Sequence, residues 1–224
     1  MTIKTTTLAA LLAAALALAA APLAAQPQAD APKKVLRVAF STAETSFDPV
    51  QISDLYSRTI TPHIFEGLYR YDHLARPAKI VPLTAAAMPE VSADYRTWTV
   101  RVRPGIYFAS DPAFKGARRE LTARDYVYSI LRTADPANRS ELWTWIASFK
   151  IAGLADKRQH HLDSKTPFDY DTEPEGLRTL DRYTLQFRLT EPNPRFLGTL
   201  ATSDLLGAVA REVVEFYGDK IGEH

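Results

Sequence analysis

Strict alternation of apolar and polar residues occurs twice in this chain, on either side of a strong helical pattern. The apolar members are Trp98, Val100 and Val102 in the first stretch, and Tyr183, Leu185, Phe187 and Leu189 in the second. A period of two is typical of a strand with one buried face. Pro104 and Gly105 indicate a turn after the first strand, so residues 106–108 are expected to return as its hairpin partner.

The helical pattern lies in "LTARDYVYSILRTADP". Thr122 and Asp125 have the spacing of a capping box, with the shorter Asp in place of Glu. An apolar face follows at Tyr126, Val127, Ile130, Leu131 and Ala134. Because the residue before a proline disfavours the helical conformation, Asp135 and Pro136 are expected to end the helix.

Other segments add further strands and helices to this pattern. Residues 35–40, "VLRVAF", predict a strand covered on both faces. A helix is expected after Ser53 as N-cap, with Pro62 causing a kink or a restart. Residues 153–176 are polar and contain two prolines, which predicts a long surface loop. Two short helices are expected near the C-terminus, and Gly218 is expected to end the second of them. Strands interspersed with helices indicate an α/β or α+β fold.

The N-terminus has the features of an export signal. Lys4 precedes an uncharged Ala/Leu-rich run at residues 8–21, and the small residue Ala25 marks the expected cleavage point. The run is shorter than the roughly 20 apolar residues that cross a bilayer. Without residues 1–25 the chain is formally neutral and it contains no cysteine, so the sequence gives no reason to expect nucleic-acid binding or a lipid anchor and favours the bacterial periplasm.

Motifs that carry enzyme chemistry are not found in the sequence. It contains no GxSxG elbow, no GxGxxG and no phosphate-binding loop. His160 and His161, with Asp156 and Asp163 nearby, are the one cluster that resembles metal ligands, but neither usual helical zinc spacing is present. We interpret the histidine pair as part of a solvated loop and predict no catalytic residue, metal or cofactor. A metallohydrolase built on the pair is the alternative.

Two tryptophans, Trp143 and Trp145, lie close together in "SELWTWIASF". On a helix, positions two apart face about 200° from one another, so one ring would enter the core and the other would remain at a surface or cleft. Aromatic side chains at such positions often line ligand sites. Packing of both rings in the core or at an interface is the alternative.

Six phrases, in this order, resemble the family 5 extracellular solute-binding proteins, the peptide-, dipeptide- and nickel-type receptors of ABC importers. They are "LRVAFSTAETSFDP", "HIFEGLYRYD", "IVPLTAAAMPEVSADYRTWTVRVRPGIYF", "LTARDYVYSILRTADP", "LRTLDRYTLQFRLTEPNPRFLGTLA" and "REVVEFYGDKIGEH". The resemblance runs from about Leu36 to the final residue. Three features depart from the family pattern. Tyr95 occupies a place where the family usually has a turn glycine, the link before the capped helix is longer than usual, and the loop at residues 153–176 is expanded.

The resemblance implies an α/β fold of the type II periplasmic binding protein kind. The chain would hold lobe one with an inserted α+β subdomain and would lack lobe two, as a fragment or truncated reading frame. Residues 26–52 and 178–224 are then the two segments of lobe one, and residues 53–177 are the inserted subdomain. Ligand is enclosed between two lobes in such receptors, so this chain alone is expected to bind peptide weakly or not at all.

The resemblance also implies a function and a set of ligand-lining residues. The leading hypothesis is the periplasmic solute-binding component of an ABC importer for oligopeptides, a monomer that delivers its cargo to permease subunits in the inner membrane. Dipeptide, nickel-chelate, haem or opine-like ligands remain open. Ala43, Glu44, Thr45 and Trp143 match ligand-lining stretches of the peptide receptors. A periplasmic peptide chaperone or a sensor subunit, using the same fold without transport, is the alternative.

Overall fold

The computed structural model describes residues 34–223, and the chain divides into two units, Met1–Ala39 and Phe40–His224. The predicted export signal at residues 1–25 lies outside the described residues. The strand predicted at residues 35–40 is wrong, because this segment is assigned to no strand and its side chains Val35 and Leu36 are 72% and 88% exposed. An apolar run becomes a strand only where partner strands satisfy its backbone groups. All helices and strands given below belong to the second unit.

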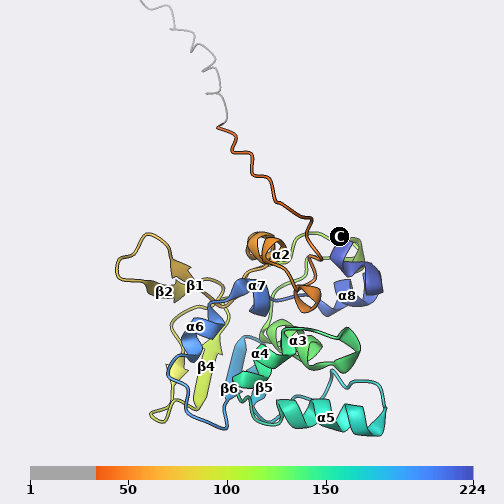
Figure 1. The fold of residues 1–224 in the computed structure, drawn as a ribbon. Helices are drawn as coiled ribbons and strands as arrows, with labels where there is room; N and C mark the ends of the chain where they lie inside the picture. The colour runs from red at the N-terminus through yellow and green to blue at the C-terminus, as the bar shows by residue number, and fades with distance from the viewer. Residues whose placement is uncertain (1–33, 224) are drawn as a thin grey trace, which may run out of the picture. The chain divides into compact units, whose positions relative to one another are not determined.

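A four-stranded antiparallel sheet carries the core of this unit (Figure 1). Its strands, in spatial order, are β3 (Glu90–Val91), β4 (Thr97–Arg101), β6 (Thr184–Arg188) and β5 (Leu177–Asp181). Both predicted alternations are confirmed, since Trp98 lies opposite Phe187. The apolar residues of β4 and β6 on this face, Trp98, Val100, Leu185 and Phe187, are at most 3% exposed. Tyr95, in the turn before β4, has φ of +56°, the conformation that usually favours glycine.

The predicted hairpin between β4 and residues 106–108 is wrong. Tyr107 forms only an isolated bridge with Glu120, and β4 pairs instead with β6 on one side and β3 on the other. Both edges of β4 are therefore occupied. Gly105, with φ of +82°, turns the chain away, and its N–H donates to the Glu120 carboxylate at 2.8 Å.

Helix α3 (Ala123–Ala134) packs against β5 and β6, and it has the predicted capping box. The Thr122 N–H donates to Asp125 Oδ2 at 2.8 Å, and the helix ends at Asp135 as expected. Its apolar face joins the core of the sheet. The Tyr126 hydroxyl is 2.6 Å from that of Thr84, which satisfies both groups where they are buried.

The remaining elements are short. The helices are α2 (Leu55–Ile60), α4 (Trp143–Ser148), α5 (Leu154–Ser164), α6 (Phe196–Leu200), α7 (Ser203–Leu206) and α8 (Arg211–Tyr217), and the 3-10 turns are η1 (Pro49–Gln51), η2 (Thr61–His63), η3 (Pro112–Phe114), η4 (Pro136–Asn138) and η5 (Gly218–Glu223). Strands β1 (Tyr69–Asp72) and β2 (Lys79–Pro82) form a separate two-stranded hairpin. Within residues 34–223, no helix combines the length and apolar character needed to cross a membrane.

Several predicted boundaries differ from those observed. The first helix is capped by Asp54 rather than Ser53, and it changes to a 3-10 turn at Pro62. Helix α5 replaces the first half of the loop predicted at residues 153–176. Only Leu154 of α5 is buried. The sequence of this helix therefore lacks the apolar stripe by which a helix is usually predicted. Three short helices, rather than two, lie near the C-terminus, and Gly218 ends the last as predicted.

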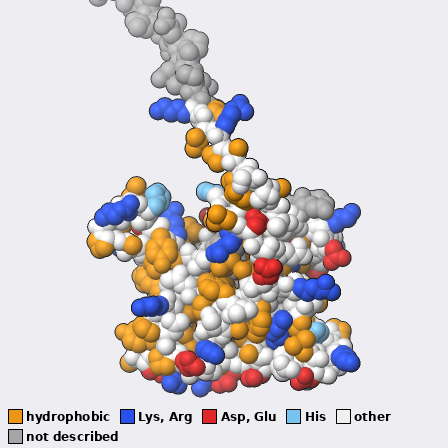
Figure 2. Space-filling model, in the orientation of Figure 1, with side chains coloured by type: hydrophobic (Ala, Val, Ile, Leu, Met, Phe, Trp, Pro, Cys, Tyr) orange, Lys and Arg blue, Asp and Glu red, His pale blue; other side chains and the backbone are white. Residues whose placement is uncertain are grey.

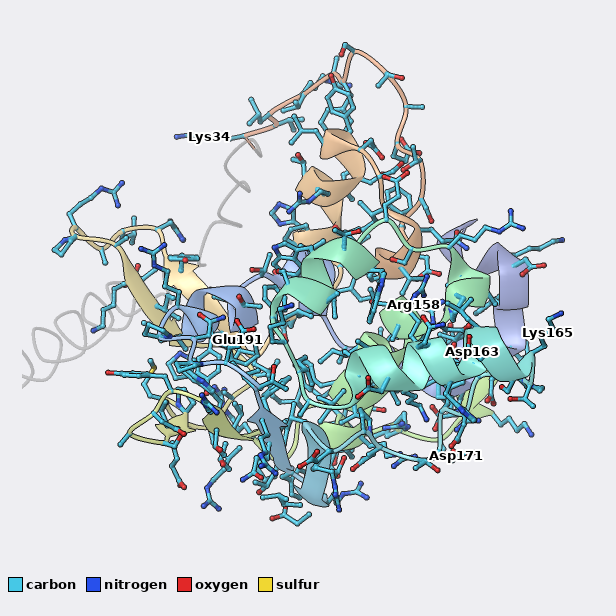
Figure 3. All side chains as sticks on the ribbon, turned by 60° about the horizontal axis from the view of Figure 1, so that its bottom comes forward. Lys34, Arg158, Asp163, Lys165, Asp171 and Glu191 are labelled. Atoms are coloured by element: carbon cyan, nitrogen blue, oxygen red, sulfur yellow. The ribbon has the colours of Figure 1, made fainter. Side chains whose placement is uncertain are left out.

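Charged side chains of both signs are interspersed over the face drawn in Figure 2, which agrees with the formal net charge of +1 for the whole sequence. The view of all side chains shows Asp163 and Lys165 at the end of α5, with Arg158 on the same helix (Figure 3).

Candidate ligand-binding pocket

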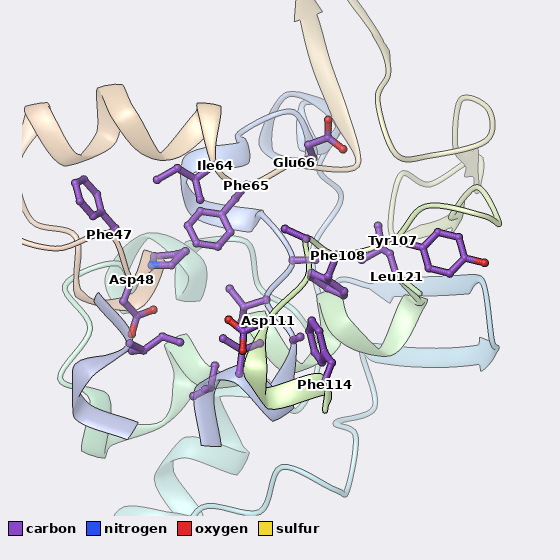
Figure 4. Close-up of a pocket in the computed structure, with 18 of the residues that line it drawn as sticks. Phe47, Asp48, Ile64, Phe65, Glu66, Tyr107, Phe108, Asp111, Phe114 and Leu121 are labelled. Atoms are coloured by element: carbon purple, nitrogen blue, oxygen red, sulfur yellow. The ribbon is translucent and has the colours of Figure 1, made fainter. Parts of the chain in front are cut away.

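A pocket of about 450 Å³ lies between three segments that are distant in sequence, residues 47–66, 106–121 and 208–221 (Figure 4). Most of its lining is apolar. The larger apolar side chains of the lining are Phe47, Ile64, Phe65, Ile106, Tyr107, Phe108, Phe114, Leu121 and Ile221, and the smaller ones include Val209, Val213 and Val214. The volume lies within the roughly 300–1,000 Å³ usual for ligand sites, and a concave apolar lining with a few polar groups is typical of them.

The link at residues 106–121 supplies one wall. Asp111 caps the 3-10 turn η3, since its Oδ1 accepts from the Ala113 N–H at 2.7 Å. This turn places the Phe114 ring 6.3 Å from the Phe108 ring, centroid to centroid. The link is closed at its base by the Leu121 N–H, which donates to a backbone carbonyl at 2.8 Å. The extra residues of this link therefore form the aromatic side of the pocket.

Helix α8 supplies the opposite wall through Val213 and Val214. The Arg119 guanidinium connects this helix to the start of α3, donating to Glu212 at 2.8 Å and to Asp125 at 2.6 Å. Burial acts to lower the pKa of Arg119, but hydrogen bonds to Asp125 and Glu212 outweigh it and raise that pKa above its usual value. Arg119 therefore remains a cation that bridges the two helices.

A buried ion pair lies beneath the pocket. Both guanidinium Nη atoms of Arg132 donate to the carboxylate of Asp48 at 2.8 Å, and the two side chains are 4% and 0% exposed. Asp48 also caps η1 by accepting from the Val50 N–H. Desolvation acts to lower the pKa of Arg132, but Asp48 raises it above the usual value, so Arg132 remains a cation. This pair joins residues 47–50 to α3.

Three of the predicted site residues lie in the loop before α2, outside the pocket lining. Ala43 and Glu44 are exposed. The Thr45 N–H donates to Asp54 Oδ2 and approaches Ser57 Oγ, each at 3.0 Å. Hydrogen bonds from Ser57, and then from Thr45, lower the pKa of Asp54 below its usual range. The loop is thus tied to α2, and its predicted contact with ligand stays a prediction.

The fourth predicted residue, Trp143, lies on α4 and also does not line the pocket. Its ring is half-buried against the core, with the Arg158 guanidinium carbon 4.9 Å from the ring centroid. Trp145 is half-buried as well and contacts Phe149 edge-on at 4.4 Å. Both tryptophans pack against the core, which is the second of the two alternatives. A ligand-binding role for Trp143 stays a prediction.

The sequence analysis missed the residues that form the aromatic wall. Phe108, Asp111 and Phe114 lie in "FASDPAF", inside the link noted as longer than the family pattern. The Asp-Pro pair is a signal for a capped turn, and aromatic residues on both sides of it indicate a packed rather than a solvated link. This signal identifies the turn but not the pocket, because the other walls come from residues far away in sequence.

The histidine pair lies on α5, so the loop predicted for it is wrong. His161 Nδ1 is buried without a hydrogen-bond partner, and the imidazole contacts Phe168 edge-on at 5.7 Å. In the part of the chain that the structure describes, no three His, Cys, Asp or Glu side chains are grouped so as to hold a metal ion.

Comparison with known proteins gives one family match and several relatives. Residues 79–220 match the model described as "Bacterial extracellular solute-binding proteins, family 5 Middle". The oligopeptide-binding protein AmiA of Streptococcus pneumoniae is 31% identical over 167 residues, which cover 74% of this chain and 23% of that protein. The periplasmic oligopeptide-binding protein OppA of Salmonella typhimurium is 28% identical, over 78% of this chain and 28% of that protein. The chain therefore spans about a quarter of the length of these relatives.

Solved structures of peptide-binding proteins also match this chain. The murein tripeptide binding protein MppA of Escherichia coli has a TM-score of 0.60 and 28% identity, over 79% of this chain and 30% of that one. Haemophilus influenzae OppA in complex with the peptide RPPGFSPFR has a TM-score of 0.61 and 25% identity, over 79% of this chain and 31% of that one.

Proposed function

The chain belongs to family 5 of the bacterial extracellular solute-binding proteins, and we propose that it binds peptides as part of the receptor of an ABC importer. The match of the family model over residues 79–220 carries this proposal. It is supported by relatives named for binding oligopeptides and murein peptides. The family is one of solute-binding proteins, so the function is binding rather than chemical conversion.

The fold agrees with this assignment. The solved neighbours are type II periplasmic peptide-binding proteins, and this chain corresponds to about 30% of each, as the predicted fold class of one partial lobe requires. The division into lobe segments at residues 26–52 and 178–224, with a subdomain at residues 53–177, stays a prediction. An exported, periplasmic location and delivery to permease subunits in the inner membrane complete the proposal.

In the proposed function the pocket buries one side chain of the peptide. Complete burial of a Leu- or Phe-sized side chain contributes about 1.5–3 kcal/mol. Association of a free peptide costs more than one such contact returns, so the remaining affinity would come from a second lobe closing over the peptide. The loop at residues 42–45 would meet the peptide backbone, and Trp143 would pack on a second side chain.

Titration of the full chain, purified from the periplasm of expressing cells, tests the proposal. Backbone amide shifts are followed by NMR while a mixture of alanine-based tripeptides is added, and maltose serves as the control solute. We expect saturable shifts with a dissociation constant of about 1 mM, equivalent to about 4 kcal/mol, and no shifts with maltose. Micromolar binding would contradict the requirement for enclosure. No saturable shift with any tripeptide would contradict peptide binding by this chain.

A further inference from the structure

The charges in the pocket lining are unbalanced. Three carboxylates line it, those of Asp48, Glu66 and Asp111, and none of the lining residues is a lysine or arginine. Arg132 neutralises Asp48 from below. Within residues 34–223, no salt bridge joins Glu66 or Asp111 to a cation. Two carboxylates of the pocket are therefore without a countercharge.

Asp111 lies in the middle of the pocket, as Figure 4 shows, beside the ring of Phe114. The Ala113 N–H donates to Asp111 Oδ1 at 2.7 Å, and the Tyr217 hydroxyl donates to Oδ2 at 3.3 Å. Both partners are neutral donors. Because an ionised carboxylate among apolar side chains is stabilised most strongly by an adjacent cation, this arrangement favours a cationic ligand.

Two arginines lie against rings of the lining, but neither is itself a lining residue. The Arg118 guanidinium carbon lies 3.8 Å from the Tyr107 ring centroid, and that of Arg119 lies 5.6 Å from the Phe108 ring centroid. The donors of Arg119 are occupied by Asp125 and Glu212 at 2.6 Å and 2.8 Å. A ligand cation would therefore meet Asp111 without competition from Arg119.

Glu66 lies at the exposed rim of the same pocket (Figure 4). A carboxylate there attracts a cation as it enters, although solvent screens the interaction. Phe65, Phe108 and Val213 line the same pocket. A lining that combines carboxylates with apolar side chains matches a ligand that has an apolar stem and a positive end.

We propose that the pocket takes a cation with an apolar stem, of the kind found in lysine and arginine side chains. The stem packs between the aromatic wall and Val213, and the cationic end is bound by Asp111. If the cation is a side chain of a bound peptide, this proposal rests on the proposed function. If the cation is a small ammonium ligand, the proposal is independent of the proposed function.

Selectivity for the cation follows from the position of Asp111. A neutral stem of equal length would displace water from the carboxylate without supplying a countercharge. The cost in free energy offsets part of the gain from burying the apolar stem. A cationic ligand avoids this cost, because it forms a charge-assisted hydrogen bond to Asp111. We expect a preference of about tenfold for the charged ligand.

The test uses pairs of probes that share an apolar stem and differ in whether the stem ends in an ammonium group. n-Hexylammonium and 1-hexanol share a six-carbon stem, and the peptides Ala-Ala-Lys-Ala-Ala and Ala-Ala-norleucine-Ala-Ala share all other residues. Each is titrated into the full chain by amide NMR. Asp111→Asn retains the acceptor for the Ala113 N–H and removes the charge. Glu66→Gln tests the rim, and Glu191→Gln, in the exposed loop after β6 (Figure 3), is the matched control.

We expect n-hexylammonium to bind about tenfold more tightly than 1-hexanol and Asp111→Asn to remove this difference. Glu66→Gln should weaken binding about twofold, and Glu191→Gln should leave it unchanged. Equal binding of the two probes, no binding of either, or a preference that persists in Asp111→Asn would overturn the inference. If both peptides bind equally, the inference fails while the proposed function stands. If the ammonium preference is found but no peptide binds, the proposed function fails and the site remains.

Discussion

Helices α3 and α8 are held in the molecule by different forces. Ten of the twelve residues of α3 are buried, whereas none of the seven residues of α8 is buried. Helix α8 is fixed at its N-terminal end by charged contacts, through Arg119 to Glu212 at 2.8 Å and through Arg211 to Asp171 at 2.6 Å. The core is therefore held by apolar burial, and one wall of the pocket is held by a few charged side chains.

Because of this difference, substitutions in the core and substitutions at the pocket wall should affect different properties, the first stability and the second binding. Loss of a buried apolar group in the core costs its transfer free energy and leaves a cavity. Loss of a partly exposed charged contact costs far less, because water replaces the partner. Substitutions around α3 should therefore unfold the chain, and substitutions around α8 should alter the pocket while the core remains folded.

The largest expected effect is in the core. Phe187 is fully buried in β6 and packs edge-on against Phe196 at 5.2 Å. Phe187→Ala should lower the free energy of unfolding by about 3–5 kcal/mol. The matched substitution on α8, Phe216→Ala, removes a ring that is 59% exposed and should cost less than about 1 kcal/mol. Urea unfolding followed by circular dichroism measures both, and equal losses would show that the two regions do not differ as stated.

The next effect lies at the boundary between the two regions. Asp48→Ala leaves the guanidinium of Arg132 buried without its partner and should destabilise the chain by about 3 kcal/mol or more. Replacing both residues, as in Asp48→Leu with Arg132→Met, should cost less than Asp48→Ala alone, because no unpaired charge remains. A double variant that is less stable than the single one would show that the pair contributes net stability beyond charge compensation.

The same contrast explains what could be predicted from sequence. Helix α3, β4 and β6 were predictable, because their apolar residues recur with the period of the element and the capping box marks where the helix begins. Each signal lies within one segment. Burial of one face then fixes how these elements pack, so the core follows directly from the pattern.

The failures have a common physical cause. Residues 35–40 have the composition of a strand, but strand formation depends on partners that local sequence does not reveal. Helix α5 has no apolar stripe, and the partners of β4 come from both sides of it in sequence. The pocket combines three distant segments, and the pairing of Asp48 with Arg132 crosses 84 positions. Local patterns carry no information on such contacts.

A smaller effect is expected at the bridge between the two helices. Arg119→Met should leave the carboxylates of Asp125 and Glu212 without their shared cation and lower the free energy of unfolding by about 2 kcal/mol. Amide exchange in α8 should accelerate more than exchange in α3. Arg195→Met, at an exposed position, is the matched control and should change neither. Equal acceleration in both helices would mean that α8 belongs to the core after all.

The smallest effect is a pH dependence of α8. Partial burial opposes ionisation of Glu212, but the hydrogen bond from Arg119 outweighs it and lowers the pKa of Glu212. A depressed pKa in the folded state contributes stability that is present above the unfolded value, about 4.3, and is lost as pH falls through the folded value. Exchange of α8 amides, corrected for intrinsic rates, should therefore become faster as the pH falls below the unfolded value.

Two variants separate this contribution from other titrations on the same helix. Glu212→Gln should give an α8 with faster exchange at neutral pH and a weaker acceleration on acidification, because the titrating group is gone. Glu215 is a second carboxylate of the helix and accepts from Arg211 at 2.6 Å, so Glu215→Gln measures the contribution of that contact. Since the Glu212 side chain is 45% exposed, the change should stay well below about 1 kcal/mol. If the wild-type acceleration persists in full in Glu212→Gln, then Glu212 does not hold α8 in place, and the charged attachment of this wall depends on Arg211 instead.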